Sequence, residues 1–373
     1  MFDWLTNPYH ITFWIPICGG ISLVVFLIAR PLSTYMKFIY PTAKYEAIGN
    51  PFILQKELDS ILELSTVSEF KEKINQKKDY VLQGDSSGEI QKSLDSHVLR
   101  TLDMMKKDSS KKMQAFFDTY RKKYDLFFVK NELKKKLLGI SSQNISNESL
   151  LPWAQRLLQD IYDTSPEKYP ELLESYGFNQ AEVLNLKANL QDVFLIDAFF
   201  DAYFLRELYQ VKVPYKCDSA KRELVQTLID IYTIKHVLRA KHLGYDHIFC
   251  KKLYLGPGRE IAPWKFTELI EQSTVSHVLH ALEGTSYYTF ITKQVDLSDV
   301  ENSLQKIENI LDIYLLQRMK ELSMKNYINI GPTIRFLISK EFEIQNLKII
   351  CKGINENVSK ETIKKFLITE GAP

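Results

Sequence analysis

Histidines are the first candidates for chemistry in this chain. His277 and His280 are three residues apart, a spacing that places two side chains on one face of a helix, as a metal site requires. Glu271 and Glu283 lie nearby, but the H-E-x-x-H arrangement of zinc hydrolases does not occur. Polar positions on a helix surface are the better interpretation, and a membrane-anchored metalloenzyme that uses His277 and His280 stays open as an alternative.

A second group of candidate metal ligands consists of His236, His242, His247 and Cys250. Their spacing matches no standard zinc site. The phosphate-binding pattern G-x-x-x-x-G-K-[ST] and the nucleophile pattern G-x-S-x-G are absent, and residues 256–258 (GPG) lack the lysine that a phosphate loop needs. The sequence therefore predicts no catalytic residue, no cofactor-binding residue and no metal ligand. We expect a protein that is not an enzyme and takes no small-molecule substrate.

The elements that would position these side chains repeat along the chain. In two copies, an aspartate is followed by basic residues at offsets 5, 9 and 11 and by glycine at offset 14. These are Asp125, Lys130, Lys134, Lys136 and Gly139, and then Asp230, Lys235, Arg239, Lys241 and Gly244. A third, partial copy opens with Glu343 and keeps Lys348 and Lys352 at offsets 5 and 9. Its glycine, Gly353, stands at offset 10 instead of 14. Self-similarity at a long period indicates one structural unit that is used several times.

Each copy is expected to be a helix that ends a larger helical unit. Apolar residues recur at helical spacing, and Gly139 and Gly244 stand where a left-handed C-terminal cap favours glycine. A proline followed by an aromatic residue opens each unit, and proline is favoured just inside a helix start. These pairs are Pro51-Phe52, Pro152-Trp153 and Pro263-Trp264. The lysines at offset 5 (Lys130, Lys235 and Lys348) are interpreted as frame residues in salt bridges or at helix C-termini.

Composition favours an all-α protein. The chain has 373 residues, 45% of them hydrophobic, with only 14 Gly and 13 Pro. The net charge of +2 gives no global indication of nucleic-acid binding. The four cysteines are far apart, which fits isolated thiols in a reducing compartment. We predict three pseudo-repeated helical units over residues 41–142, 143–255 and 256–373, preceded by a membrane span and its flank over residues 1–40.

The N-terminal region differs in kind, because the 19 residues from 11 to 29 carry no charge. That length nearly crosses a hydrocarbon core of about 30 Å. Arg30, Lys37 and Lys44 follow the run, so the positive-inside rule places the rest of the chain in the cytoplasm. The sequence therefore predicts a single transmembrane helix, with the N-terminus outside and the body on the cytoplasmic face of the cell membrane. A signal peptide and a buried core helix are the competing interpretations.

The segment 106–136 is rich in lysine, and aromatic residues lie between the lysines. A nucleic-acid surface is one interpretation of this pattern. A solvated helix face is the better one, and a surface near anionic lipid head groups is a further alternative. We expect no nucleic-acid partner.

The repeated lines resemble those of a known family. Residues 229–244 (IDIYTIKHVLRAKHLG) are similar to the line D-x-x-N-L-K-x-x-L-R-x-K-x-x-G of the C subunit of archaeal-type ATP synthases, a family that includes the d subunit of the vacuolar ATPase. Residues 124–139 resemble the earlier copy of that line, and residues 336–353 resemble the family's C-terminal line. The asparagine that precedes the lysine in the family is replaced by Val129 and Ile234 in the first two copies. The resemblance covers about residues 40 to 370.

The resemblance implies an all-helical, pseudo-threefold, funnel-like body without ATPase activity of its own. It would join the proteolipid rotor ring to the central-stalk subunits and transmit torque for ion-coupled ATP synthesis or hydrolysis. The membrane span over residues 11–29 is an addition to the family's pattern and would contact membrane lipid. Our hypothesis is that this helix enters the central opening of the ring. The alternative function is a membrane-anchored helical scaffold that tethers another cytoplasmic protein.

Overall fold

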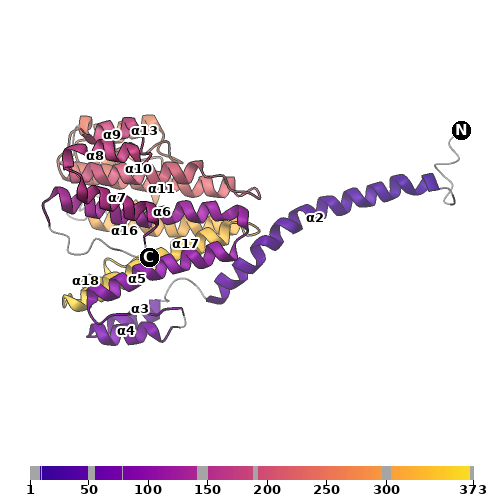
Figure 1. Cartoon of the computed structure of the whole chain (residues 1–373), viewed down its shortest axis with the longest axis horizontal. Coiled ribbons are helices and arrows are strands. Elements are labelled where there is room, and N and C mark those ends of the chain that lie inside the picture. Colours follow the sequence, from indigo (N-terminus) through magenta and orange to yellow (C-terminus); the bar gives the residue numbers. More distant parts are fainter. Residues whose placement is uncertain are drawn as a thin grey trace.

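The computed structural model describes residues 9, 11–48, 55–77, 79–140, 150–187, 192–295 and 304–369. Every regular element in these ranges is a helix (Figure 1), which confirms the prediction of an all-α protein. Six long helices form the body. They are α5 (Ser87–Asp108), α6 (Gln114–Leu137), α10 (Val193–Gln210), α11 (Asp218–His242), α16 (Leu304–Lys325) and α17 (Gly331–Asn355).

These six helices are three hairpins that pack into a closed ring. Within the hairpins, α5 packs against α6, α10 against α11, and α16 against α17. Between hairpins, α6 packs against α10, α11 against α16, and α17 returns to α5. Because α17 packs against α5, the third hairpin contacts the first, and the ring is closed. Apolar side chains from all six helices are buried in one continuous core.

Short helices precede each hairpin and cover the ring. Before α5 lie α3 (Gln55–Leu62) and α4 (Val67–Asn75). Between the first and second hairpins lie α7 (Pro152–Asp163), η2 (Pro166–Lys168), α8 (Tyr169–Ser175) and α9 (Gln180–Lys187). Between the second and third lie α12 (His247–Cys250), η3 (Lys251–Leu253), α13 (Pro263–Glu271), α14 (Val275–Ala281) and α15 (Ser286–Thr292). The 3-10 turn η1 (Lys111–Met113) joins α5 to α6, and α18 (Lys360–Lys364) follows α17.

Helix starts follow the sequence signals. Pro152 and Pro263 are the first residues of α7 and α13, as predicted, while Pro51 lies outside the described residues. Ser86 and Glu89 form a capping box at the start of α5, in which each side chain pairs with the other residue's backbone N–H. The Asp192 side chain caps α10 by accepting a hydrogen bond from the Phe194 N–H.

The second helix of every hairpin ends in the same turn. The residue at offset 14 from Asp125, Asp230 and Glu343 has a positive φ: 68° at Gly139, 79° at Gly244 and 52° at Asn357. In each copy the N–H at offset 15 bonds the carbonyl at offset 10, and the N–H at offset 14 bonds the carbonyl at offset 11. This is the Schellman pattern. The left-handed caps predicted at Gly139 and Gly244 are confirmed.

The third copy of this turn is intact, although its glycine stands earlier in the sequence. Gly353 lies inside α17, where an added Cβ would come within 2.5 Å of the Ile363 Cδ1 atom. The glycine therefore permits the close approach of α18. Asn357 takes the left-handed position, because asparagine tolerates this backbone region better than other residues that carry a Cβ.

Helix α2 (Ile11–Ile48) differs from the rest of the fold. Its C-terminal part packs against α5 and α17, and its N-terminal part extends away from the body (Figure 1). The described ranges contain no helix that is both long enough and apolar enough to cross a membrane. The charge-free run of 11–29 contains Pro16 and is followed directly by Arg30, so its 19 residues fall just short of the about 20 apolar residues of a typical span.

The predicted transmembrane helix over residues 11–29 is therefore wrong. The predicted topology rested on that span and is withdrawn with it. The withdrawn predictions are that the N-terminus lies outside, that the body lies on the cytoplasmic face of the cell membrane, and that residues 11–29 contact membrane lipid.

The Schellman turn at Asn357 makes a testable prediction. Asn357→Gly should stabilise the fold by about 0.5 kcal/mol, because glycine adopts a positive φ without a steric penalty. Asn357→Val should destabilise it by about 1 kcal/mol or more, because a β-branched residue opposes that conformation. Thermal unfolding of the two variants beside the parent chain measures both effects. A Val variant as stable as the Gly variant would contradict the assigned turn.

Candidate functional site

The repeated lysines form ion pairs between neighbouring hairpins. Lys130 Nζ lies 3.3 Å from Asp201 Oδ1, Lys235 Nζ lies 2.6 Å from Asp312 Oδ1, and Lys348 Nζ lies 2.8 Å from Asp95 Oδ1. In all three pairs the aspartate is the ninth residue of the first helix in the next hairpin. The interpretation of these lysines as frame residues in salt bridges is confirmed.

The residues at offset 9 add a second pair at two of the three joints. Lys134 Nζ lies 2.5 Å from Asp197 Oδ2. Arg239 binds Glu308 through two hydrogen bonds, of 2.5 Å from Nε and 2.6 Å from Nη2, the bidentate geometry that suits guanidinium and carboxylate groups. Asp197 and Glu308 are both the fifth residue of their helix, and the fifth residue of α5 is the neutral Gln91. Lys352 therefore has no acidic counterpart at this position of α5.

Electrostatics differ between the two more buried pairs. Burial raises the pKa of Asp201, but the hydrogen bond with His236 and the charge of Lys130 outweigh it, so the pKa lies below its usual value. Burial raises the pKa of Asp312 and Lys235 only partly offsets this, so the pKa lies above its usual value. Asp312 therefore depends strongly on the cation of Lys235, to which the charge of Lys123 adds a smaller contribution.

The candidate histidines are dispersed. His236 is buried, with Nε2 3.2 Å from Asp201 Oδ2, so it belongs to the first joint. His277 and His280 lie exposed on α14, and His277 Nδ1 is 3.2 Å from the Ser273 Oγ atom. His242 and His247 are exposed, whereas the Cys250 thiol is buried. In the part of the chain that the structure describes, no group of three or more His, Cys, Asp or Glu side chains could hold a metal ion.

The opening acid of each copy holds the beginning of another segment. Asp230 accepts hydrogen bonds from the N–H groups of Arg259, Glu260 and Ile261 at 2.8–3.0 Å and from the Tyr287 hydroxyl at 2.9 Å. An added Cβ on Gly258 would lie 1.7 Å from the Asp230 Oδ1 atom, so only glycine fits there. Asp230 thus fixes the loop that leads into α13.

The other two acids serve the same purpose with different partners. Asp125 accepts the Leu151 N–H at 3.4 Å, directly before Pro152 opens α7. Glu343 accepts hydrogen bonds from the Tyr80 hydroxyl and, at 3.0 Å, from Lys340 Nζ. Burial raises the pKa of both Asp125 and Asp230 to about 6, although their hydrogen bonds oppose the shift. These carboxyl groups are thus the titratable points that link the hairpins to the helices around them.

A further charge cluster lies inside the ring. Lys123 Nζ on α6 is 2.8 Å from Glu341 Oε2 on α17, and the Tyr120 and Tyr124 hydroxyls also donate to Glu341. Burial lowers the pKa of Lys123, but Glu341 and the nearby tyrosines reverse this, and the pKa lies well above its usual value. Tyr232 on α11 interacts electrostatically with charged residues of α6, α10, α16 and α17, namely Lys123, Asp201, Asp312 and Glu341.

The base of α2 contacts the turn end of all three hairpins. Lys44 Nζ lies 2.7 Å from Asp108 Oδ2 in the first hairpin. Lys37 Nζ lies 3.2 Å from the Tyr215 hydroxyl and 4.2 Å from its ring centroid, in the turn of the second. Tyr45 stacks on Phe336 of the third, with ring centroids 4.5 Å apart. The starts of α6, α11 and α17 therefore lie at one end of the ring.

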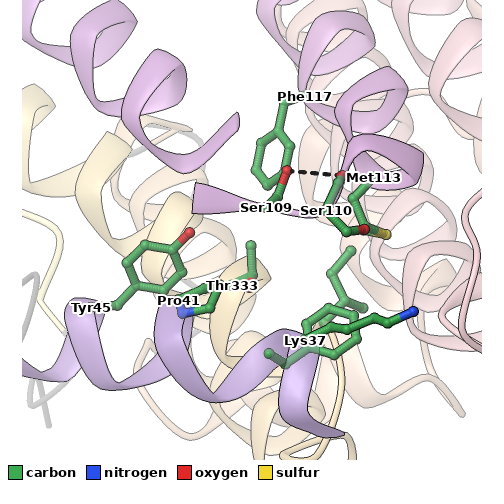
Figure 2. A pocket seen from close by; sticks show the side chains of 10 residues that line it. Lys37, Pro41, Tyr45, Ser109, Ser110, Met113, Phe117 and Thr333 are labelled. Atoms are coloured by element: carbon green, nitrogen blue, oxygen red, sulfur yellow. Dashed lines mark hydrogen bonds between the residues drawn. The ribbon is translucent and has the colours of Figure 1, made fainter. Parts of the chain in front are cut away.

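A small cavity marks this junction. Figure 2 shows Lys37, Pro41 and Tyr45 of α2 on one side, with Ser109, Ser110 and Met113 of the first hairpin turn and Thr333 of α17 around them. Tyr45 is almost fully buried, and burial raises the pKa of its hydroxyl above its usual value. This environment keeps the hydroxyl protonated and the junction uncharged at its centre.

The three-hairpin frame matches one family of known proteins. The family model described as "ATP synthase (C/AC39) subunit" matches residues 41–366, which include all three hairpins. The chain belongs to this family. This match confirms the family that the repeated lines resembled. In the structure, those lines lie on the second helices of the three hairpins, α6, α11 and α17.

Curated relatives in the family match along most of their length. The C subunit of the A-type ATP synthase of Methanobrevibacter smithii is 29% identical, over 90% of this chain and 88% of the relative. The C subunit of the A-type ATP synthase of Methanothermobacter thermautotrophicus is 28% identical, over 93% of this chain and 91% of the relative.

The acidic partners of the repeated lysines were not predicted. Asp95, Asp201 and Asp312 precede the opening acids of their own hairpins by 30, 29 and 31 residues, so they do not stand at a fixed offset from the repeated line. Counting from the start of each hairpin's first helix would have aligned them. The interior pair of Lys123 and Glu341 belongs to one joint only and leaves no repeated signal.

Burial predicts different energies for the equivalent lysine pairs. The side chains of Lys235 and Asp312 are 13% and 14% exposed, whereas Asp95 beside Lys348 is 56% exposed. Lys235→Met should lower the free energy of unfolding by about 3 kcal/mol, because it leaves a buried carboxylate without its cation. Lys348→Met, the matched control, should cost less than about 1 kcal/mol. Denaturant unfolding tests this order, and equal losses would contradict it.

The raised pKa of Asp230 predicts a pH effect. Its folded value of about 6 lies above the unfolded value of about 3.9, so the folded state binds the proton more tightly. The stabilisation from this group is complete below about pH 4 and is lost as the pH rises through about 6. Asp230→Asn should remove about 2–3 kcal/mol of pH dependence between about pH 4 and 7.

The measurement is the free energy of unfolding at several pH values in both chains. Only the difference between their slopes reports Asp230, because other carboxyl groups titrate in the same range. Asp95→Asn, at an exposed carboxylate, serves as the control. A parent chain and an Asp230→Asn variant with parallel pH profiles would refute the shift.

Proposed function

We propose that this chain is a non-catalytic central-stalk subunit of an A/V-type rotary ATP synthase or ATPase. It links the proteolipid rotor ring to the central shaft and transmits torque, through a body of three repeat units over residues 41–142, 143–255 and 256–373. The observation that carries the proposal is the closed ring of hairpins, joined at every interface by an ion pair at the same position.

A closed ring suits the transmission of torque. An open row of hairpins would bend or separate at its free edges, whereas each hairpin here is held by two neighbours. Interiors packed at crystal-like density transmit strain, and the core runs through all three hairpins. The pairs of Lys130, Lys235 and Arg239 add directional contacts, which oppose sliding of one hairpin along the next.

The ring also offers two separate ends for two partners. The helices α6, α11 and α17 begin at the end where α2 is attached and finish at the three Schellman turns. A helix of this length spans about 36 Å, so the two ends are well separated. Exposed apolar side chains surround the Schellman end, as at a protein interface: Leu138, Ile140, Leu243, Ile248 and Val358.

The proposal predicts co-purification with ATPase subunits. Affinity isolation of the full chain from its own cells in mild detergent, followed by mass spectrometry, should recover proteolipid, central-shaft and catalytic-head subunits in fixed proportions. Leu243→Glu, at an exposed position of the Schellman end, should reduce recovery of the shaft and head subunits at least tenfold without lowering the melting temperature. Leu184→Glu on α9 is the matched control, and recovery of none of these subunits with the parent chain would refute the proposal.

A further inference from the structure

A cavity of about 260 Å³ lies between the second hairpin and two of the short segments that cover it. Leu186 of α9 lines one side, and Lys251 and Lys252 of η3 line another. Between them, α10 contributes one face, with residues at the helical spacing i, i+3, i+4 and i+7: Leu195, Ala198, Phe199 and Ala202. The cavity is thus built from separate elements of the fold rather than from a single loop.

Two alanines make this space. Ala198 and Ala202 are about one helical turn apart on α10, so their short side chains leave a depression that longer side chains would fill. The floor beside them is held in place, because the Phe199 ring stacks on Phe178 with ring centroids 5.3 Å apart. Protein interiors contain few voids larger than a water molecule. A cavity of this size beside well-packed rings is therefore a candidate ligand site.

The lining is apolar at the floor and basic at the rim. The side chains of Leu186 and Leu195 are 2% and 5% exposed. Lys251 is exposed, and Lys252 is partly exposed with its Nζ atom 5.9 Å from the centre of the Phe249 ring. Among the described residues that line the cavity, none is acidic. An apolar floor below two cations complements a molecule that carries an apolar tail and an anionic head group.

The volume of the cavity limits the length of the tail. An apolar cavity of about 150 Å³ holds benzene, which has six carbon atoms. By that measure, the cavity of about 260 Å³ accommodates a chain of roughly ten carbon atoms. The two long chains of a membrane lipid exceed this volume, so a short single chain fits best.

We propose that this cavity binds a single-chain anionic amphiphile, with a carboxylate or phosphate head group and a tail of roughly ten carbon atoms. The tail lies against Ala198 and Ala202, and the head group pairs with Lys251 and Lys252 at the rim. The bound molecule bridges α10 and η3, and η3 belongs to the link between the second and third hairpins. The inference goes beyond the proposed function and does not depend on it, because the cavity residues take no part in the ion pairs of the joints.

The test is calorimetric titration of the full chain with octanoate, octyl phosphate and the uncharged 1-octanol. At least one of the two anions should bind once per chain and at least tenfold more tightly than 1-octanol, because only an anion pairs with the lysines. Shortening the tail of that anion by two CH₂ groups should weaken binding about tenfold. Comparison of the two anions identifies the preferred head group. No binding of either anion, or equal binding of 1-octanol, would overturn the inference.

Variants distinguish the cavity from other apolar surfaces of the chain. Ala202→Phe fills the cavity from a partly exposed position and should abolish binding of the anion without lowering the melting temperature. Lys251→Gln changes an exposed side chain, so it leaves the fold intact, and it should weaken the anion at least fivefold while 1-octanol binds as before. Lys212→Gln, at an exposed lysine between α10 and α11, is the matched control and should bind like the parent. Undiminished binding of the anion to Ala202→Phe or to Lys251→Gln would refute the site, whether or not the chain co-purifies with ATPase subunits.

Discussion

The cation at offset 5 of each repeated line is the interaction on which the rest of the structure depends. It lies on the second helix of one hairpin and binds an aspartate at the ninth position of the next hairpin's first helix. A hairpin of two helices cannot bury all of its apolar surface, so it must pack against neighbours on both sides. The ion pair selects the axial register of that packing, because apolar contacts alone tolerate a shift along the helices. One pair, used three times, thereby sets the register at every joint of the ring.

The three joints are not equally strong, and the weakest by this criterion connects the ends of the body. Lys348 and Asp95 are 253 residues apart, their pair is partly exposed, and Gln91 offers no charge to Lys352. Buried polar contacts beside it compensate. Lys340 binds Asp79 and Glu343, and Glu343 accepts the Tyr80 hydroxyl. Burial raises the pKa of Asp79, but the hydrogen bond with His97 and the charge of Lys340 together lower it by more, so this pKa lies below its usual value. The closing joint thus relies on a buried network rather than on the repeated pair.

Much of this fold was predictable, because local rules determine helix ends. The prolines of α7 and α13 and the glycine caps of α6 and α11 followed from backbone restrictions on single residues. The acids at the ninth position were not predicted, since their distance from the repeated line is not constant and no shared pattern surrounds them. The cap at Asn357 was not predicted, because the glycine of the third copy stands four residues earlier, at position 353. The wrong prediction for residues 11–29 has a different cause. An apolar run indicates only that a helix must be shielded from water, and it does not determine what shields the helix.

The attachment of α2 connects these features mechanically. A force on its projecting part reaches Asp108, Tyr215 and Phe336, which belong to three different hairpins. A load shared in this way pulls the turn ends of the hairpins together or apart, and the joints between neighbouring hairpins must resist it. The pairs nearest the Schellman end, Lys134–Asp197 and Arg239–Glu308, lie one helical turn beyond the offset-5 pairs and hold the far end of two joints. The third joint has Gln91 at that level, so under load the ring should yield first between α17 and α5 at the Schellman end.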